Sequence, residues 1–112
     1  MQIPVQVSFH GVDHSDSVKQ KVHDKVAKLG RFCPDIISCR VTIGKQRKSP
    51  HVEYHKGEPF QVGIDVAVPG DVLVVQRGPH ESDGGEDIAI ALRDAFEAMS
   101  RKVRSYADRR RA

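Results

Sequence analysis

The sequence predicts an α+β fold, a two-layer sandwich in which two helices cover one face of a four-stranded sheet. Four segments alternate apolar and polar residues as half-buried strands do, and two segments carry apolar residues at helical spacing. These segments follow one another in the order β-α-β-β-β-α. Because each helix has a single apolar stripe, we expect the second face of the sheet to stay bare. A chain of 112 residues suits a single domain, residues 1–112.

The N-terminal part predicts a strand followed by a helix. Apolar and polar residues alternate over Ile3 to Val12, and Pro4 near the start favours an edge strand. Ser15 can cap the helix, because its hydroxyl can accept a hydrogen bond from a free backbone N–H. Gly30 suits the left-handed residue just past the helix end. The apolar stripe expected to face the core is Val18, Val22, Val26 and Leu29.

Three further strands are expected, from about Ile36 to Gly44, from Phe60 to Val68 and from Val72 to Gln76. The Pro69–Gly70 pair predicts a tight turn, so the last two strands should form a hairpin. A helical connection makes the first two strands parallel, and the other neighbours antiparallel. On the second strand, the residues expected on the apolar face are Ile37, Cys39, Val41 and Ile43.

The second helix is expected from about Glu86 to Arg109. Its apolar stripe comprises Ile88, Leu92, Phe96, Met99, Val103 and Tyr106. No apolar stretch approaches the ~20 residues of a membrane span, and the N-terminus lacks the pattern of a secretory signal. With no Trp and 5% aromatic residues, a site built on stacked aromatics is disfavoured. We therefore expect a cytoplasmic protein without a membrane partner.

The formal net charge of +3 hides an uneven distribution of basic residues. In the first helix Lys21, Lys25 and Lys28 have i, i+4, i+7 spacing and share one flank. The second helix has two basic rows, namely Lys102 with Arg109, and Arg93 with Arg104 and Arg111. If the helices lie side by side, some rows converge and could meet successive phosphates of an RNA backbone. The alternative is a solvated surface whose cations favour the helix C-terminus.

Enzymatic and metal sites are weakly supported. The chain has no G-x-S-x-G nucleophile turn and no phosphate-binding G-x-x-x-x-G-K-[ST] loop, so we expect no catalysis and no cofactor. His51 and His55 have an H-x3-H spacing and His80 could approach them, but zinc usually requires about four ligands. Ordinary loop histidines are therefore the preferred interpretation. Cys39 lies on an apolar strand face and is most simply a small buried hydrophobe.

Nearly the whole chain resembles the family of ribosome hibernation-promoting factors and ribosome-associated inhibitors, also called sigma-factor modulation proteins. The resemblance is carried by MQIPVQVSFHGV, by the helix ending KVAKLGRF and by the strand IISCRVTI. It continues through HKGEPFQVGIDVAVPGDVLVV and EDIAIALRDAFEAMSRKV. It implies a non-enzymatic translation inhibitor that binds small-subunit rRNA in the mRNA–tRNA channel under stress or in stationary phase. The resemblance is to the short form, in which pairing of ribosomes would need a separate factor.

The family motifs and the helical rows together define the expected RNA-binding residues. The family's K-x-x-K-L motif falls at Lys25 and Lys28, and its second-helix contact falls at Arg101. The full set is Lys21, Lys25, Lys28, Arg31, Arg93, Arg101, Lys102, Arg104 and Arg109. Ribosomal proteins are a further expected partner. Two other hypotheses are a protein–protein adaptor that uses the bare sheet face and a histidine-based metal-binding module.

Overall fold

The structure, a computed structural model, describes residues 3–45, 60–77 and 88–111. Its elements are β1 (Val5–His10), α1 (Asp16–Phe32), β2 (Ser38–Lys45), β3 (Phe60–Val68), β4 (Asp71–Arg77) and α2 (Ile88–Arg111). The strands form a single sheet in the order β1-β2-β3-β4. β1 is parallel to β2, and the other two pairs are antiparallel. This confirms the predicted α+β fold and its β-α-β-β-β-α order.

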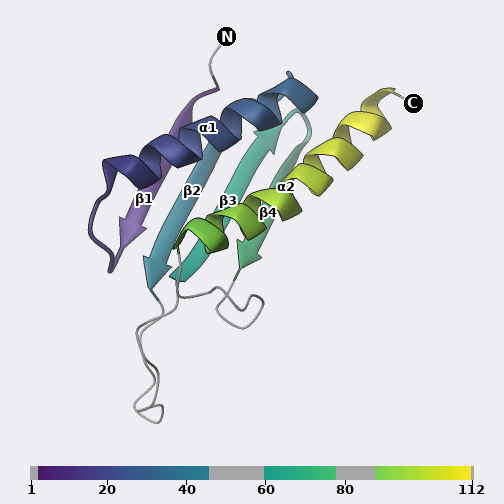
Figure 1. Cartoon of the computed structure of the whole chain (residues 1–112). Coiled ribbons are helices and arrows are strands. Elements are labelled where there is room, and N and C mark those ends of the chain that lie inside the picture. Colours follow the sequence, from purple (N-terminus) through teal and green to yellow (C-terminus); the bar gives the residue numbers. More distant parts are fainter. Residues whose placement is uncertain (1–2, 46–59, 78–87, 112) are drawn as a thin grey trace.

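Both helices lie on the same face of the sheet and run in nearly the same direction (Figure 1). α2 packs on β3 and β4, α1 lies beside β1, and the two helices contact each other. The opposite face of the sheet carries no described element, as the single apolar stripe on each helix predicted. None of the helices within the described ranges has the length and apolar character needed to cross a bilayer.

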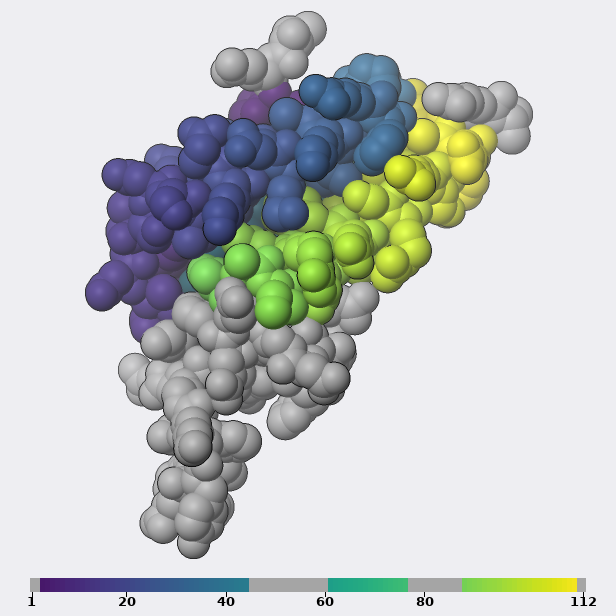
Figure 2. Space-filling model, in the orientation of Figure 1, coloured from purple at the N-terminus to yellow at the C-terminus, as the bar shows by residue number. Residues whose placement is uncertain are grey.

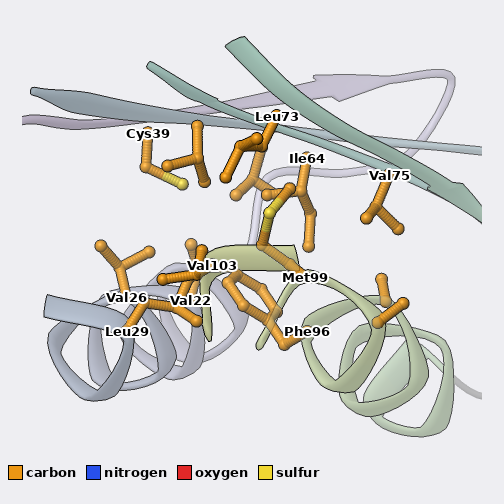
Figure 3. Packing of buried hydrophobic residues seen from close by; sticks show 14 of the residues in the cluster. Val22, Val26, Leu29, Cys39, Ile64, Leu73, Val75, Phe96, Met99 and Val103 are labelled. Atoms are coloured by element: carbon orange, nitrogen blue, oxygen red, sulfur yellow. The ribbon is translucent and has the colours of Figure 1, made fainter. Parts of the chain in front are cut away.

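The core lies between the sheet and the helix layer (Figure 3). All four predicted stripe residues of α1 are buried, and on α2 only Ile88 of the predicted stripe is half-buried. The largest side chains with essentially no exposure include Leu29, Ile43, Ile64, Leu92 and Met99. The described residues contain no buried charged or polar side chain. Burial of apolar area is therefore the main source of stability in this interior.

The limits of α1 confirm one sequence prediction and correct another. The Ser15 hydroxyl accepts a hydrogen bond from the Val18 N–H at 3.3 Å, as expected for an N-cap. Gly30, however, is not the residue past the helix end, because α1 continues to Phe32 and the Cys33 N–H bonds to the Leu29 carbonyl. A Cβ atom at Gly30 would lie 2.9 Å from Cδ1 of Ile3. Residue 30 therefore lies against the flexible end of the Ile3 side chain, where the N-terminal segment passes the helix.

Several other element boundaries differ from the predicted ones. β1 covers Val5–His10 rather than Ile3 to Val12, because Gly11 adopts a left-handed conformation with φ of 68° and ends the extended backbone. Ile37 was expected on the buried face but is 55% exposed, since β2 begins only at Ser38 and Ile36 occupies the core instead. α2 ends two residues later than predicted, and Glu86 lies outside the described residues.

The β3–β4 hairpin is confirmed in detail. Val68 pairs with Asp71 across the two-residue turn, and Gly70 has a φ of 83°, which L-residues rarely adopt. The Tyr106 hydroxyl donates to the carbonyl of Pro69 at 2.8 Å. The C-terminal half of α2 is therefore tied to this turn, which fixes the helix along the sheet.

Candidate nucleic-acid interface

One basic flank of α1 faces α2. At 100° per residue, Lys21, Lys25 and Lys28 lie on the same side of α1 as Phe32. The guanidinium of Arg104 in α2 lies 4.4 Å from the centroid of the Phe32 ring, so this side of α1 is turned toward α2. Lys21 and Lys28 are exposed and Lys25 is half-buried. The three ammonium groups therefore border the line along which the helices adjoin. Figure 2 shows the two helices side by side on this face of the molecule.

α2 contributes a matching row on its side of this line. Arg93 and Arg104 are eleven residues apart and lie within about 20° of each other around the helix, on the flank facing α1. Both are exposed. We call the surface formed by these two rows the inter-helix furrow, defined by Lys21, Lys25, Lys28, Arg93 and Arg104. The predicted convergence of basic rows is thus found for these five residues.

Four other predicted residues lie beside the furrow rather than in it. Arg31 and Arg101 occupy the outward sides of their helices, away from the sheet. Lys102 and Arg109 share the flank of α2 turned away from α1, so this second row does not converge with the lysines of α1. A shallow open hollow on the outward side of α2 is lined by Arg101, Arg104, Ser105, Asp108 and Arg109. Basic groups therefore extend from the furrow across the outer surface of α2.

Most of these cations have no acidic partner among the described residues. In the described part of the chain, eight of the nine predicted residues form no ion pair, the exception being Arg93. The Arg93 guanidinium lies 3.3 Å from the Asp94 carboxylate, an exposed contact that contributes little to stability. Arg110, by contrast, bonds to Asp35 at 3.1 Å and lies over the Tyr106 ring. Arg110 therefore joins the end of α2 to the α1–β2 connection.

The charge of the helix layer rises toward the helix C-termini, which lie at the same end of the molecule (Figure 1). The N-terminal halves of α1 and α2 have a slight excess of acid: their charged residues are Lys19, Lys21 and Arg93 against Asp16, Asp24, Asp94 and Glu97. The C-terminal halves contain Lys25, Lys28, Arg31, Arg101, Lys102, Arg104, Arg109, Arg110 and Arg111, with Asp108 as their single acid. Such a field attracts a polyanion toward one end of the furrow.

Phe32 is a candidate interface residue that the sequence analysis did not identify. It lies at the end of α1, half-buried, and its ring supports the Arg104 guanidinium. A cation–π contact of this kind holds a long side chain in place without neutralising its charge. The pairing joins residues far apart in the sequence, so no local pattern could reveal it. The presence of an aromatic residue beside the lysine flank was the one available signal.

The three histidines of the metal hypothesis, His51, His55 and His80, all lie outside the described residues. Across the described ranges, no group of three or more potential ligands is found. His14 bonds instead to the Asp16 carboxylate at 2.8 Å, beside the first turn of α1.

The two cysteines are buried and unpaired with each other. Burial, and secondarily the negative charge of Asp65, raises the pKa of Cys39 from 9.0 to about 12. A thiol with so high a pKa is a poor nucleophile at neutral pH, because the thiolate is the reactive form. The prediction that Cys39 is a small core residue is confirmed, since it is 2% exposed.

Comparison with known proteins agrees with the fold and the sequence resemblance. The sequence profile of the family described as sigma 54 modulation protein / S30EA ribosomal protein matches residues 5–111. No curated protein matches the chain by sequence.

Two solved structures are similar across almost their entire lengths. The N-terminal domain of protein Y from Thermus thermophilus is 16% identical, with a TM-score of 0.64, and the match covers 95% of this chain and 99% of that one. A ribosomal subunit interface protein from Coxiella burnetii is 19% identical, with a TM-score of 0.66, and the match covers 93% of this chain and 97% of that one. At these identities the likeness concerns the fold.

Proposed function

Because this chain belongs to the sigma 54 modulation protein / S30EA ribosomal protein family, we propose that it is a non-enzymatic translation inhibitor that binds the small ribosomal subunit. The family is ribosome-associated, and this chain would act in the cytoplasm under stress or in stationary phase. In our proposal the helix layer contacts rRNA in the mRNA–tRNA channel. The protein would then exclude mRNA and tRNA by occupancy alone, without a chemical step.

The observation that supports this proposal is the inter-helix furrow and its basic surroundings. Two rows of cations from separate helices border one line, and most of them form no ion pair with another residue in the described ranges. Cations in such rows can replace the counterions condensed on a folded RNA backbone, and this release drives binding. A solvated surface needs no such convergence of rows from two helices.

The test is cosedimentation of the protein with purified small subunits at increasing salt. If roughly 4–6 phosphates are contacted, the logarithm of the association constant should fall with the logarithm of salt concentration with a slope of about −3 to −5. A variant combining Lys25→Ala, Lys28→Ala, Arg101→Ala and Arg104→Ala should bind more weakly and have a slope shallower by about 3. The matched control is Lys19→Ala, an exposed lysine on the other flank of α1.

A flat salt dependence of the unmodified protein would contradict the proposal, and so would unchanged binding by the quadruple variant. The location is tested separately by a chemical footprint of the protein on intact ribosomes. We expect protection of rRNA in the mRNA–tRNA channel and loss of tRNA binding. If rRNA were protected only on another surface of the subunit, the protein would bind RNA but would not inhibit translation by occupying the mRNA–tRNA channel.

A further inference from the structure

The second basic row of α2, Lys102 and Arg109, lies next to the last strand of the sheet. α2 packs on β3 and β4, and the contact of Arg104 with Phe32 marks its side toward α1. Lys102 and Arg109 lie about 140–160° around the helix from Arg104, so they face away from α1, beyond β4 (Figure 1). We call these two residues the distal flank of α2. It borders the outer edge of β4 on the helix side of the sheet.

The outer edge of β4 has free backbone groups. β4 ends the sheet and pairs only with β3. The Ile37 N–H donates to the Ala67 carbonyl at 2.8 Å, so the backbone groups of Ala67 point away from β4. Because Ala67 pairs with Val72 and backbone directions alternate along a strand, those of Val72, Val74 and Gln76 point outward. The outward groups of Val74 and Gln76 form no hydrogen bond with any residue in the described ranges.

β4 lacks the features with which proteins usually protect such an edge. Its pairing with β3 is regular along the whole strand, with no bulge, and its outward residues include no lysine and no proline. Val72 and Val74 are 56% and 42% exposed on the open face of the sheet. The Val72 N–H is bonded to the Asp71 carboxylate at 2.7 Å, which leaves Val74 and Gln76 as the open part of the edge.

A strand added at this edge would present its side chains alternately to the two faces of the sheet. Its side chains opposite Val72 and Val74 would lie on the open face beside these exposed valines, where apolar residues fit. Its side chains opposite Leu73 and Val75 would lie on the helix face, because both of these residues are buried in the core. There they would meet the cations of the distal flank, where carboxylates fit.

We propose that the β4 edge and the distal flank together bind an extended segment of another protein in which acidic residues alternate with apolar ones. The N–H and C=O groups of Val74 and Gln76 supply the hydrogen bonds of the strand pair. The acidic side chains of the segment bind Lys102 and Arg109, and its apolar side chains cover the exposed valines. Recognition of this kind takes affinity from the backbone and specificity from alternate side chains.

Charge complementarity favours this partner over a second copy of the chain and over RNA. Lys102 and Arg109 are exposed, and neither forms an ion pair with a residue in the described ranges. A second β4 would bring two distal flanks together, and its helix-face residues Leu73 and Val75 carry no charge to neutralise them. RNA could neutralise the distal flank, but it has no regular row of amide groups to pair with the edge.

The proposed contact is separate from the inter-helix furrow. The furrow lies on the side of α2 turned toward α1, and the distal flank lies on the other side. A strand bound at β4 would therefore leave the furrow uncovered. The proposal does not rest on the proposed RNA binding, and each can fail without the other.

The test uses the full chain and, as the probe, a seven-residue peptide of alternating valine and glutamate with blocked ends. Titration to about 2 mM peptide covers micromolar to millimolar dissociation constants. Amide hydrogen exchange at Val74 and Gln76 should slow as the peptide binds. Leu73, whose N–H points toward β3, should be unchanged and serves as the control. A peptide of alternating valine and lysine should bind at least about tenfold more weakly.

Charge reversal tests the distal flank. Lys102→Glu combined with Arg109→Glu should weaken binding of the glutamate peptide about tenfold or more and strengthen binding of the lysine peptide. The matched control is Lys21→Glu combined with Lys28→Glu, which reverses two cations of the furrow at the same seven-residue spacing. This control should change binding of the glutamate peptide less than about threefold, because salt screens distant charges. It should still weaken binding to small subunits.

Four results would overturn the proposal. The first is unchanged exchange at Val74 over the whole titration, and the second is glutamate-peptide binding that survives reversal of the distal flank. The third is exchange at Val74 that slows with protein concentration in the absence of peptide, which would assign the edge to a second copy. The fourth is an equal loss of small-subunit binding in the two double variants, which would assign the distal flank to RNA.

Discussion

The outer surface of the helix layer and the open face of the sheet differ in chemistry, although both cover the same core. The helix layer presents cations in rows, with nine basic residues and one acid in the C-terminal helix halves. The open face presents Val72 and Val74 beside a single opposed pair, Arg40 and Asp65. The contrast teaches that one small fold can present rows of cations on one surface and apolar side chains on the other.

The difference arises from how each element exposes its residues. A helix buries one stripe and leaves most of its circumference in water, where long cationic side chains keep their hydration. A strand exposes alternate residues close to its backbone, so β-branched residues that favour the sheet also dominate its open face. Rows of charge therefore belong on the helices, and apolar contact surface belongs on the sheet.

The largest expected effect is a difference in stability between a substitution on the buried side of the helix layer and one on the open face of the sheet. Leu92→Ala should lower the free energy of unfolding by about 2–5 kcal/mol, because Leu92 is completely buried and its loss leaves a cavity. Val72→Thr on the open face should change it by less than about 0.5 kcal/mol. Urea denaturation measures both. Equal losses would mean that the open face also holds the fold together.

The next prediction compares the charge of the two surfaces. Arg101→Glu combined with Arg104→Glu should weaken binding to small subunits roughly 100-fold at low salt, about 2.7 kcal/mol, by removing two phosphate contacts and adding repulsion. Arg40→Glu on the open face should weaken it less than about threefold. Cosedimentation of both variants with small subunits at one salt concentration measures the two losses of binding. A larger loss for Arg40→Glu would place the RNA on the sheet.

A third prediction concerns Cys39, which lies on the inner face of the sheet. Its folded-state pKa is raised from 9.0 to about 12, so the folded protein holds the thiol proton more tightly than the unfolded chain does. The resulting contribution to the free energy of unfolding is fully present below pH 9 and decreases as pH rises above 9. At pH 10 the decrease is about 1.4 kcal/mol. Cys39→Ala should lack this part of the pH dependence in urea denaturation at pH 8 and pH 10. Identical pH dependence in both proteins would contradict it.

Periodicity in the sequence predicted most of the fold. Burial of Val22, Leu29 and Met99 follows from spacing alone, because helical and strand periods determine which residues share a face. The end of α1 could not be predicted in the same way. Glycine often follows the last residue of a helix, but Gly30 lies inside α1, which continues to Phe32. Gly30 lies next to Ile3, and this contact joins distant parts of the chain and leaves no local sequence pattern.

The candidate interface was predictable only in part, for a similar reason. The lysine row of α1 is encoded by i, i+4, i+7 spacing, but which row of α2 meets it depends on how the helices pack. The Phe32–Arg104 contact decides this in favour of Arg93 and Arg104, and leaves Lys102 on the far flank. Likewise, the Asp35–Arg110 pair joins residues 75 positions apart and gives no local sequence signal.

The smallest expected effects on stability come from substituting one glycine in the helix layer and one in the sheet layer. Gly30→Ala should raise the free energy of unfolding by about 0.5 kcal/mol, because alanine favours a helix and the atom it would meet, Cδ1 of Ile3, ends a flexible side chain. Gly70→Ala should lower it by about 1 kcal/mol, because φ of 83° strains any L-residue although the space around it is open. Thermal and urea unfolding of both variants measure whether the two changes in the free energy of unfolding have opposite signs. If Gly30→Ala proved the more damaging change, Ile3 would be held rigidly against α1, and the N-terminal segment would belong to the core.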